Sequence, residues 1–170
     1  KARLIDTTWD TEQGTPVFTV EGKYTTRGWT EWTQGFQYGC MILAGDGLGD
    51  DALIDLGRQR TVEHMLPHVT HIGVHDHGFN NLSTYGNLLR LHREGRLGDN
   101  PWEAKYYEQL IAASGAVQAA RWQGTPGDTS DPHCANSPAL GYVYSFNGPH
   151  SLFIDTMRTT YIHFMFDRHE

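Results

Sequence analysis

A short run rich in histidine and aspartate holds the residues best suited to acid–base chemistry. It reads His71-Ile-Gly-Val-His75-Asp76-His77-Gly78-Phe79, and a helical pattern follows it directly. A second aspartate, Asp155, stands in another apolar run far downstream. Aspartate is also a common cap or turn residue, so neither one is informative alone. Together they offer the two carboxylates that glycosidic chemistry uses, one protonated and one ionised.

The neighbours of Asp155 indicate which role it would take. Phe153, Ile154 and Met157 surround it in the sequence, and an apolar setting of this kind favours a protonated carboxyl group. Arg158 shares the face of the expected helix and opposes that effect, so we expect it to bind an acidic group of the substrate instead. The alternative is a purely structural ion pair or helix cap.

Trp32, His75 and His150 are the other candidates for the pocket. An aromatic ring such as Trp32 can stack on the apolar face of a sugar, although a place in the hydrophobic core would explain it equally well. His75 is adjacent to Asp76 and can orient it or tune its charge, or can simply hydrogen-bond to the backbone. His150 precedes Asp155 on the loop before the last expected helix.

Helical patterns separated by turn signals must position these residues. Apolar residues recur at helical spacing, and Gly, Asp and Pro mark the ends. A strand or extended arm is expected at Pro16–Val20, within an arm over 1–28, and a long lid or rim loop at about 124–138. The expected helices run from Trp32 to near Gly45, from Asp50 or Asp51 to Pro67, from about Asn81 to His92, from Pro101 to about Trp122, and onward from about Ser151.

An internal repeat predicts how the helices are arranged. Tyr38-Gly39 and Leu48-Gly-Asp50 are echoed at offsets of 47 and 49 residues by Tyr85-Gly86 and Leu97-Gly-Asp99. Repeated helical hairpins of this size predict an all-α stacked array or toroid. A ring of six hairpins needs roughly twice this length, so we expect an open arc or a part of a longer protein. In such an array Trp32, Asp76 and Asp155 would each lie at the start of a helix, and all three would face the same end.

Composition bounds the possible functions. The 170 residues suit one packed domain. A formal net charge of −7 argues against non-specific nucleic-acid binding. No apolar run approaches the length of a membrane span. The two cysteines, Cys40 and Cys134, form no disulfide framework and leave the compartment open, with cytoplasm or periplasm favoured over a membrane.

Three short motifs resemble those of the unsaturated glucuronyl hydrolases of glycoside hydrolase family 88. Trp32-Thr-Gln-Gly-Phe36 is similar to the family's Trp-Thr-x-Gly-Phe, and the run from His75 to Phe79 is similar to His-Asp-x-Gly-Phe. Ile154-Asp-Thr-Met157 is similar to Ile-Asp-x-Met. Their order, with helices between them, covers about residues 29–165.

The resemblance implies an (α/α)6 barrel that acts on a terminal, 4,5-unsaturated uronic acid of a polysaccharide fragment. It implies that Asp155 is the general acid and base, that Asp76 assists, and that Trp32 shapes the sugar site. It implies neither a metal nor an organic cofactor. A second chain or a further segment would complete the barrel.

The chain also departs from that family. Family members run to about twice this length, as the resemblance implies, and their later aromatic, His and Arg substrate residues would lie beyond Glu170. Arg158 stands where the family commonly continues with Met-Asn, so the substrate could instead be an ordinary saturated glucuronide.

Two other classes of function are open at this stage. His64, His68, His71 and His75 are spaced by four, three and four residues and could bind a divalent metal with Asp76 and His77, as in HD-type metal-dependent phosphohydrolases. Pro67 and Gly73 interrupt the helix that would align those histidines. The other class is a non-catalytic α/α domain that binds carbohydrate.

Overall fold

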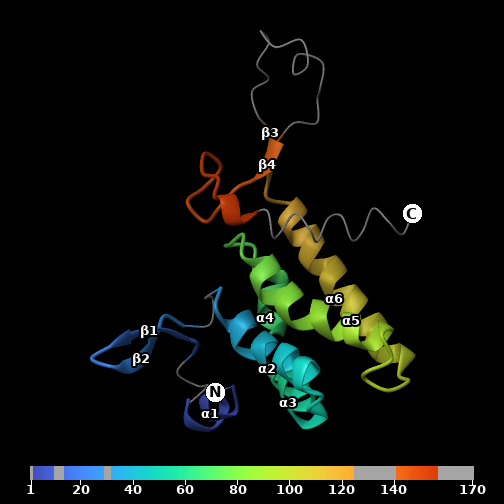
Figure 1. Cartoon of the computed structure of the whole chain (residues 1–170). Helices are drawn as coiled ribbons and strands as arrows, with labels where there is room; N and C mark the ends of the chain where they lie inside the picture. Colours follow the sequence, from blue (N-terminus) through green and yellow to red (C-terminus); the bar gives the residue numbers. More distant parts are fainter. Residues whose placement is uncertain (1, 10–13, 29–31, 125–140, 157–170) are drawn as a thin grey trace.

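The computed structural model describes residues 2–9, 14–28, 32–124 and 141–156. Within these ranges the chain is mostly helical, and two small antiparallel sheets accompany the helices (Figure 1). The elements are α1 (Ala2–Thr8), β1 (Pro16–Val20), β2 (Lys23–Thr26), α2 (Gln34–Leu48), α3 (Asp51–His64), α4 (Leu66–Thr70), the π-helical η2 (Gly78–Gly86), α5 (Asn87–Arg93), α6 (Pro101–Ala119), β3 (Trp122–Gly124), β4 (Gly141–Val143) and the 3₁₀ turn η3 (Ile154–Thr156).

Helices α2 and α3 form the first hairpin, and the turn between them follows the sequence signals. Gly49 ends α2 with a left-handed φ of 67°, a conformation that glycine adopts without a Cβ penalty. The side chain of Asp50 then accepts a hydrogen bond from the Leu53 amide at 3.0 Å, which caps α3. The expected cap at Asp50 or Asp51 is therefore confirmed, at Asp50.

Helix α2 also crosses η2 at very short range. A Cβ on Gly35 would lie 2.4 Å from the Asn80 Cα, and one on Gly39 would lie 2.5 Å from the Ser83 carbonyl oxygen. Both glycines let the two backbones approach closely. The crossing places the start of α2 against the start of η2, directly after His75 and Asp76.

The main hydrophobic core lies between α2, α3, η2, α5 and α6. Its largest fully buried apolar or aromatic side chains come from all five elements, so the two hairpins share one core. They include Tyr38, Met41, Ile42, Ile54, Tyr85, Leu88, Leu91 and Tyr107.

Several predicted boundaries need correction. Helix α3 ends at His64, and Pro67 lies in the first turn of α4, where a missing amide hydrogen costs nothing. The helix expected over 81–92 begins earlier, as η2, and continues as α5. Helix α6 ends at Ala119, because the chain then enters β3, in which Trp122 pairs with Val143 of β4.

The helix expected from about Ser151 was wrong for the residues described there. Residues 151–153 are irregular, and only the short η3 follows. Ser151 donates its amide hydrogen to the Gly148 carbonyl and accepts one at its own carbonyl from Ser145. These backbone groups are committed to a compact turn and cannot join a helix. The expected loop at 124–138 lies outside the described residues except at Gly124.

The described elements form two helical hairpins and not a closed ring. The all-α expectation holds for the helical bulk but not for the β1–β2 and β3–β4 pairs. The strand expected at Pro16–Val20 is confirmed as β1, whereas the extended arm expected over 1–28 also contains the helix α1. None of the described helices combines the length and apolar character that crossing a bilayer requires.

A buried polar link joins α2, α4 and η2. His68 donates from Nε2 to the Gln34 side-chain oxygen at 2.5 Å and accepts at Nδ1 from the Asn80 amide at 3.1 Å. The orientation of the Asn80 amide is set by its oxygen, which accepts from the Gly35 backbone amide at 2.9 Å. The bonds therefore select the neutral form of His68. Burial, together with the nearby His77 and His71, lowers the pKa of His68 to about 4.

Stability should therefore decrease in mild acid. The pKa of folded His68 lies below the ordinary 6.5, so the unfolded chain binds the proton more readily. The contribution of neutral His68 to the unfolding free energy is complete above pH 6.5 and is lost as the pH falls toward 4. The loss is about 1.4 kcal/mol per pH unit and roughly 3 kcal/mol in all. Urea unfolding between pH 7.5 and 4.5 measures it.

Two variants separate this effect from general acid sensitivity. His68→Asn should remove about half of the pH dependence of the unfolding free energy, because the second buried histidine, His77, whose pKa is also lowered to about 4, still titrates over the same range. His150→Asn, which changes an exposed histidine, should leave the slope as it is in the parent chain. An unchanged slope in His68→Asn would contradict the assignment.

Candidate functional site

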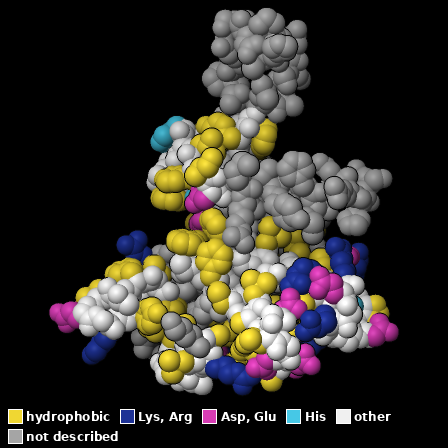
Figure 2. Space-filling view, in the orientation of Figure 1, with side chains coloured by type: hydrophobic (Ala, Val, Ile, Leu, Met, Phe, Trp, Pro, Cys, Tyr) yellow, Lys and Arg dark blue, Asp and Glu magenta, His cyan; other side chains and the backbone are white. Residues whose placement is uncertain are grey.

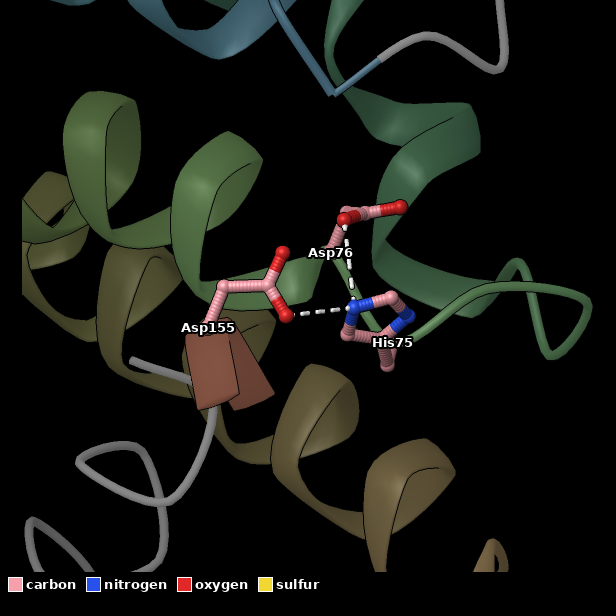
Figure 3. Close-up of side chains that lie close together, drawn as sticks. All are labelled: His75, Asp76 and Asp155. Atoms are coloured by element: carbon pink, nitrogen blue, oxygen red, sulfur yellow. Dashed lines mark hydrogen bonds and ion pairs between the residues drawn. The ribbon is translucent and has the colours of Figure 1, made fainter. Parts of the chain in front are cut away.

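His75, Asp76 and Asp155 come together at one point of the fold (Figure 3). The His75 Nε2 lies 3.0 Å from the Asp155 Oδ1 and 3.7 Å from the Asp76 Oδ1. One oxygen of each carboxylate and this nitrogen all lie within 4.8 Å of one another. Residues 79 positions apart in the chain thus share one small polar cluster, which we call the His–Asp cluster.

Solvent reaches the His–Asp cluster from one side. The side chain of His75 is 2% exposed, that of Asp76 is 11% exposed and that of Asp155 is 41% exposed. A bound molecule would therefore meet Asp155 first. Two carboxylates at this separation repel each other when both are ionised, so a proton on one of them or on His75 stabilises the arrangement.

Local structure explains how each residue is presented. His75 and Asp76 lie on the short connection between α4 and η2, and the Asp76 carbonyl accepts from the Asn80 amide at 3.1 Å. The connection is closed by His77, whose Nε2 donates to the His71 carbonyl at 2.8 Å. Asp155 lies in η3 on a separate segment.

A hydrogen bond between His77 and Ser114 links this connection to α6. The His77 Nδ1 accepts from the Ser114 hydroxyl at 2.8 Å, and that oxygen accepts in turn from the Asn81 amide at 2.9 Å. Burial lowers the pKa of His77 to about 4. His77 thus acts as a neutral structural contact facing α6, outside the His–Asp cluster.

Two phenylalanines cover the His75 ring. Phe146 and Phe153 each stack on it, with ring centroids 5.9 Å away and interplanar angles of 20° and 18°. Their own side chains are partly exposed, and hydrophobic side chains gather over the segment between β4 and η3 (Figure 2). The aromatic cover fixes the plane of the imidazole and keeps its nitrogen directed at the two carboxylates.

Trp32 belongs to a second aromatic group beside the start of η2. Its ring lies 5.7 Å from Phe36 and 5.6 Å from Phe79, in tilted or edge contacts. Trp32 is 44% exposed, so it is neither a core residue nor a free surface ring. It offers a partly open aromatic face for stacking, and its ring neighbour Phe79 follows Asp76 by three positions in the chain.

Other sequence candidates lie elsewhere. His150 is exposed and is not part of the His–Asp cluster. Arg158 lies outside the described residues. The four-histidine metal hypothesis is wrong in its residue set: His68 contacts Gln34 and Asn80, and the one candidate metal group among the described residues is His75, Asp76 and Asp155.

Sequence reasoning missed Phe146, Phe79 and Arg121. Phe79 is the last residue of the His75–Phe79 motif, in which only the histidine and aspartate were expected to have a role. Phe146 has no local signal, since only the fold brings it over His75. Arg121 belongs to a helix expected to continue through it, and its contacts depend on a β pairing that has no strong pattern.

Comparisons with protein-family models, curated proteins and solved structures find no match for this chain. The chemistry of the His–Asp cluster therefore carries the functional argument.

Proposed function

We propose that the chain is a glycoside hydrolase acting on terminal glucuronic or 4,5-unsaturated glucuronic residues of polysaccharide fragments. The observation that carries the proposal is the pair of carboxylates, from Asp76 and Asp155, each with an oxygen within 3.7 Å of one buried imidazole nitrogen. Such a pair can hold one proton on one carboxyl group and leave the other ionised.

Asp155 suits the role of general acid and base because it is the more accessible carboxyl group. For an unsaturated substrate, its proton would pass to the C4 carbon of the enol-ether double bond, leaving positive charge shared by C5 and the ring oxygen. Water would add at C5 while the Asp155 carboxylate takes its proton, so one side chain serves both steps in turn. The hydrated ring then opens and releases the next sugar.

The remaining residues have supporting roles in this proposal. Asp76 stays ionised and stabilises the developing positive charge on the sugar. His75 holds the Asp155 oxygen at hydrogen-bonding distance. Trp32 offers an aromatic face to the sugar ring, and Arg158 is proposed to bind the uronate carboxylate. His150 remains a proposed substrate contact at the rim.

The fold is proposed to be an arc of an (α/α)6 toroid. Two observations support this: the hairpins α2–α3 and η2/α5–α6 share one core, and Trp32, His75 and Asp76 lie on connections that precede α2 or η2. A second chain or a further segment would complete the ring. We propose an acidic oligosaccharide as the ligand, with no nucleic acid or membrane partner and no metal or organic cofactor.

Incubation with matched unsaturated and saturated glucuronyl disaccharides tests the proposal. We expect the unsaturated substrate to lose its enol-ether absorbance while free sugar is released in equal amount. If sugar is released from the saturated disaccharide alone, the chain is still a glycosidase, but hydration of the double bond is excluded as its mechanism. Binding of both sugars without any release would favour a non-catalytic binding domain.

A metal-dependent hydrolase is the second candidate, because the His–Asp cluster also has the donor set of a divalent metal site. Imidazole and carboxylate ligands bound 2.0–2.2 Å from one ion lie roughly 3–4 Å apart, and the two distances from His75 fall in that range. Elemental analysis and chelation separate the candidates. The glycosidase should keep its rate in EDTA, whereas bound metal and chelator-sensitive phosphoester hydrolysis would select the metalloenzyme.

A further inference from the structure

Side chains at the end of α6 donate hydrogen bonds to both chain segments that carry the His–Asp cluster. Arg121, directly after α6, is 2% exposed. Its Nε and one terminal nitrogen donate to the Tyr144 carbonyl at 3.1 and 2.7 Å, and its other terminal nitrogen donates to the Ile72 carbonyl. One turn earlier, Gln118 donates to the Val74 carbonyl at 3.0 Å.

The acceptors are informative because of where they lie in the chain. Ile72 and Val74 immediately precede His75 and Asp76. Tyr144 follows β4 and begins the segment that continues to Asp155. A single guanidinium thus bonds to backbone on both sides of the His–Asp cluster, and the fork geometry of arginine suits two acceptors at once.

The charge of Arg121 is also unusual for so buried a group. Its hydrogen bonds to described residues go to neutral carbonyl oxygens, and the guanidinium carbon lies 4.3 Å from the Tyr144 ring centroid. Burial lowers the pKa of Arg121, while Tyr144 and Asp76 act in the opposite direction. Arginine stays charged in proteins, so the buried guanidinium is a cation that bonds to carbonyl oxygens on both segments.

We propose that Arg121 is a positioning residue of the candidate site, which fixes the connection bearing His75 and Asp76 against the segment bearing Asp155. Gln118 supplies a second attachment for the same connection. The kinetic consequence rests on the proposed glycosidase function, whereas the attachment itself does not. A misplacement of about 1 Å between catalytic groups can reduce a rate by roughly 100-fold.

The test combines Arg121→Met with Arg121→Lys. Methionine retains much of the aliphatic stem without charge or donors, and lysine retains the charge and donors but not the fork. Arg93→Met is the matched control, because Arg93 on α5 makes a partly exposed ion pair with Glu108 on α6. Hydrogen exchange is followed in peptides covering 71–77 and 144–153, and steady-state kinetics are measured on the unsaturated disaccharide.

For Arg121→Met we expect exchange to become about tenfold faster in both peptides while the α2–α3 peptides keep their protection. We expect kcat to fall by roughly 100-fold with KM changed less than about threefold, and Arg121→Lys to recover part of kcat. Arg93→Met should resemble the parent chain in both measurements.

Unchanged exchange in either peptide of Arg121→Met would overturn the attachment. Faster exchange with an unchanged kcat would overturn the positioning role and leave a structural one. If the parent chain releases no sugar at all, the proposed function fails, and the exchange result still decides whether Arg121 joins the two segments. If Arg121→Met does not fold, Arg121→Lys carries the same comparison, with a smaller expected change.

Discussion

Asp155→Asn should abolish turnover of the unsaturated disaccharide while leaving the fold intact, with kcat lowered by about 10³-fold or more. Asparagine has the size of aspartate but cannot give up or accept the transferred proton. Asp155 is the exposed member of the His–Asp cluster and the one that a sugar can approach. Single-turnover release of sugar, followed with the enol-ether absorbance, measures the loss.

Folding must be checked in the same variant. The Asp155 side chain is 41% exposed, so its replacement should change the unfolding free energy by less than about 1 kcal/mol. Asp99→Asn, at an exposed aspartate before α6, is the matched control and should keep full activity. Activity of Asp155→Asn near that of the parent would remove Asp155 from the mechanism, and the glycosidase proposal would fail with it.

The parts of the fold that follow from local rules were predictable. The α2–α3 hairpin has a glycine that takes the left-handed conformation and an aspartate that caps the next helix, Gly49 and Asp50. Asn100 and Pro101 likewise mark the start of α6. Each signal lies within four residues of the structure it specifies, so sequence alone contains the information.

The parts that depend on distant contacts were not predictable in the same way. The β3–β4 pair joins residues about twenty positions apart by only three register pairs, too few to leave an alternating pattern. The π-helical η2 cannot be distinguished from an α-helix by apolar spacing. Its path is set by close backbone contact with α2 at Gly35 and Gly39.

The candidate site was partly accessible from sequence. Residues of the expected types occur at His75, Asp76 and Asp155, and the structure brings these three together. Phe146 and Arg121 could not be found, because a buried guanidinium that bonds to carbonyl oxygens leaves no charged partner in the sequence. Their contribution is visible only once the chain is folded.

The second large effect is expected from Gly35→Ala, through the crossing of α2 and η2. A Cβ at this position would lie 2.4 Å from both the Asn80 Cα and the Phe79 carbonyl oxygen. These are backbone atoms, which cannot rotate away as the end of a side chain can. We expect the unfolding free energy to fall by about 3 kcal/mol, at the upper end of the usual cost of overpacking, as measured by urea unfolding.

Gly47→Ala in the same helix is the matched control. No heavy atom lies within 4 Å of a Cβ at Gly47, so alanine should be neutral or add up to about 1 kcal/mol of stability through its higher helix propensity. A Gly35→Ala chain as stable as the parent would show that α2 and η2 are not in close backbone contact.

The backbone atoms that Gly35 approaches belong to Phe79 and Asn80, which follow Asp76 by three and four positions. The surviving folded fraction of Gly35→Ala should therefore also lose activity per molecule, because the displacement of η2 reaches the carboxylate that the proposed mechanism keeps ionised.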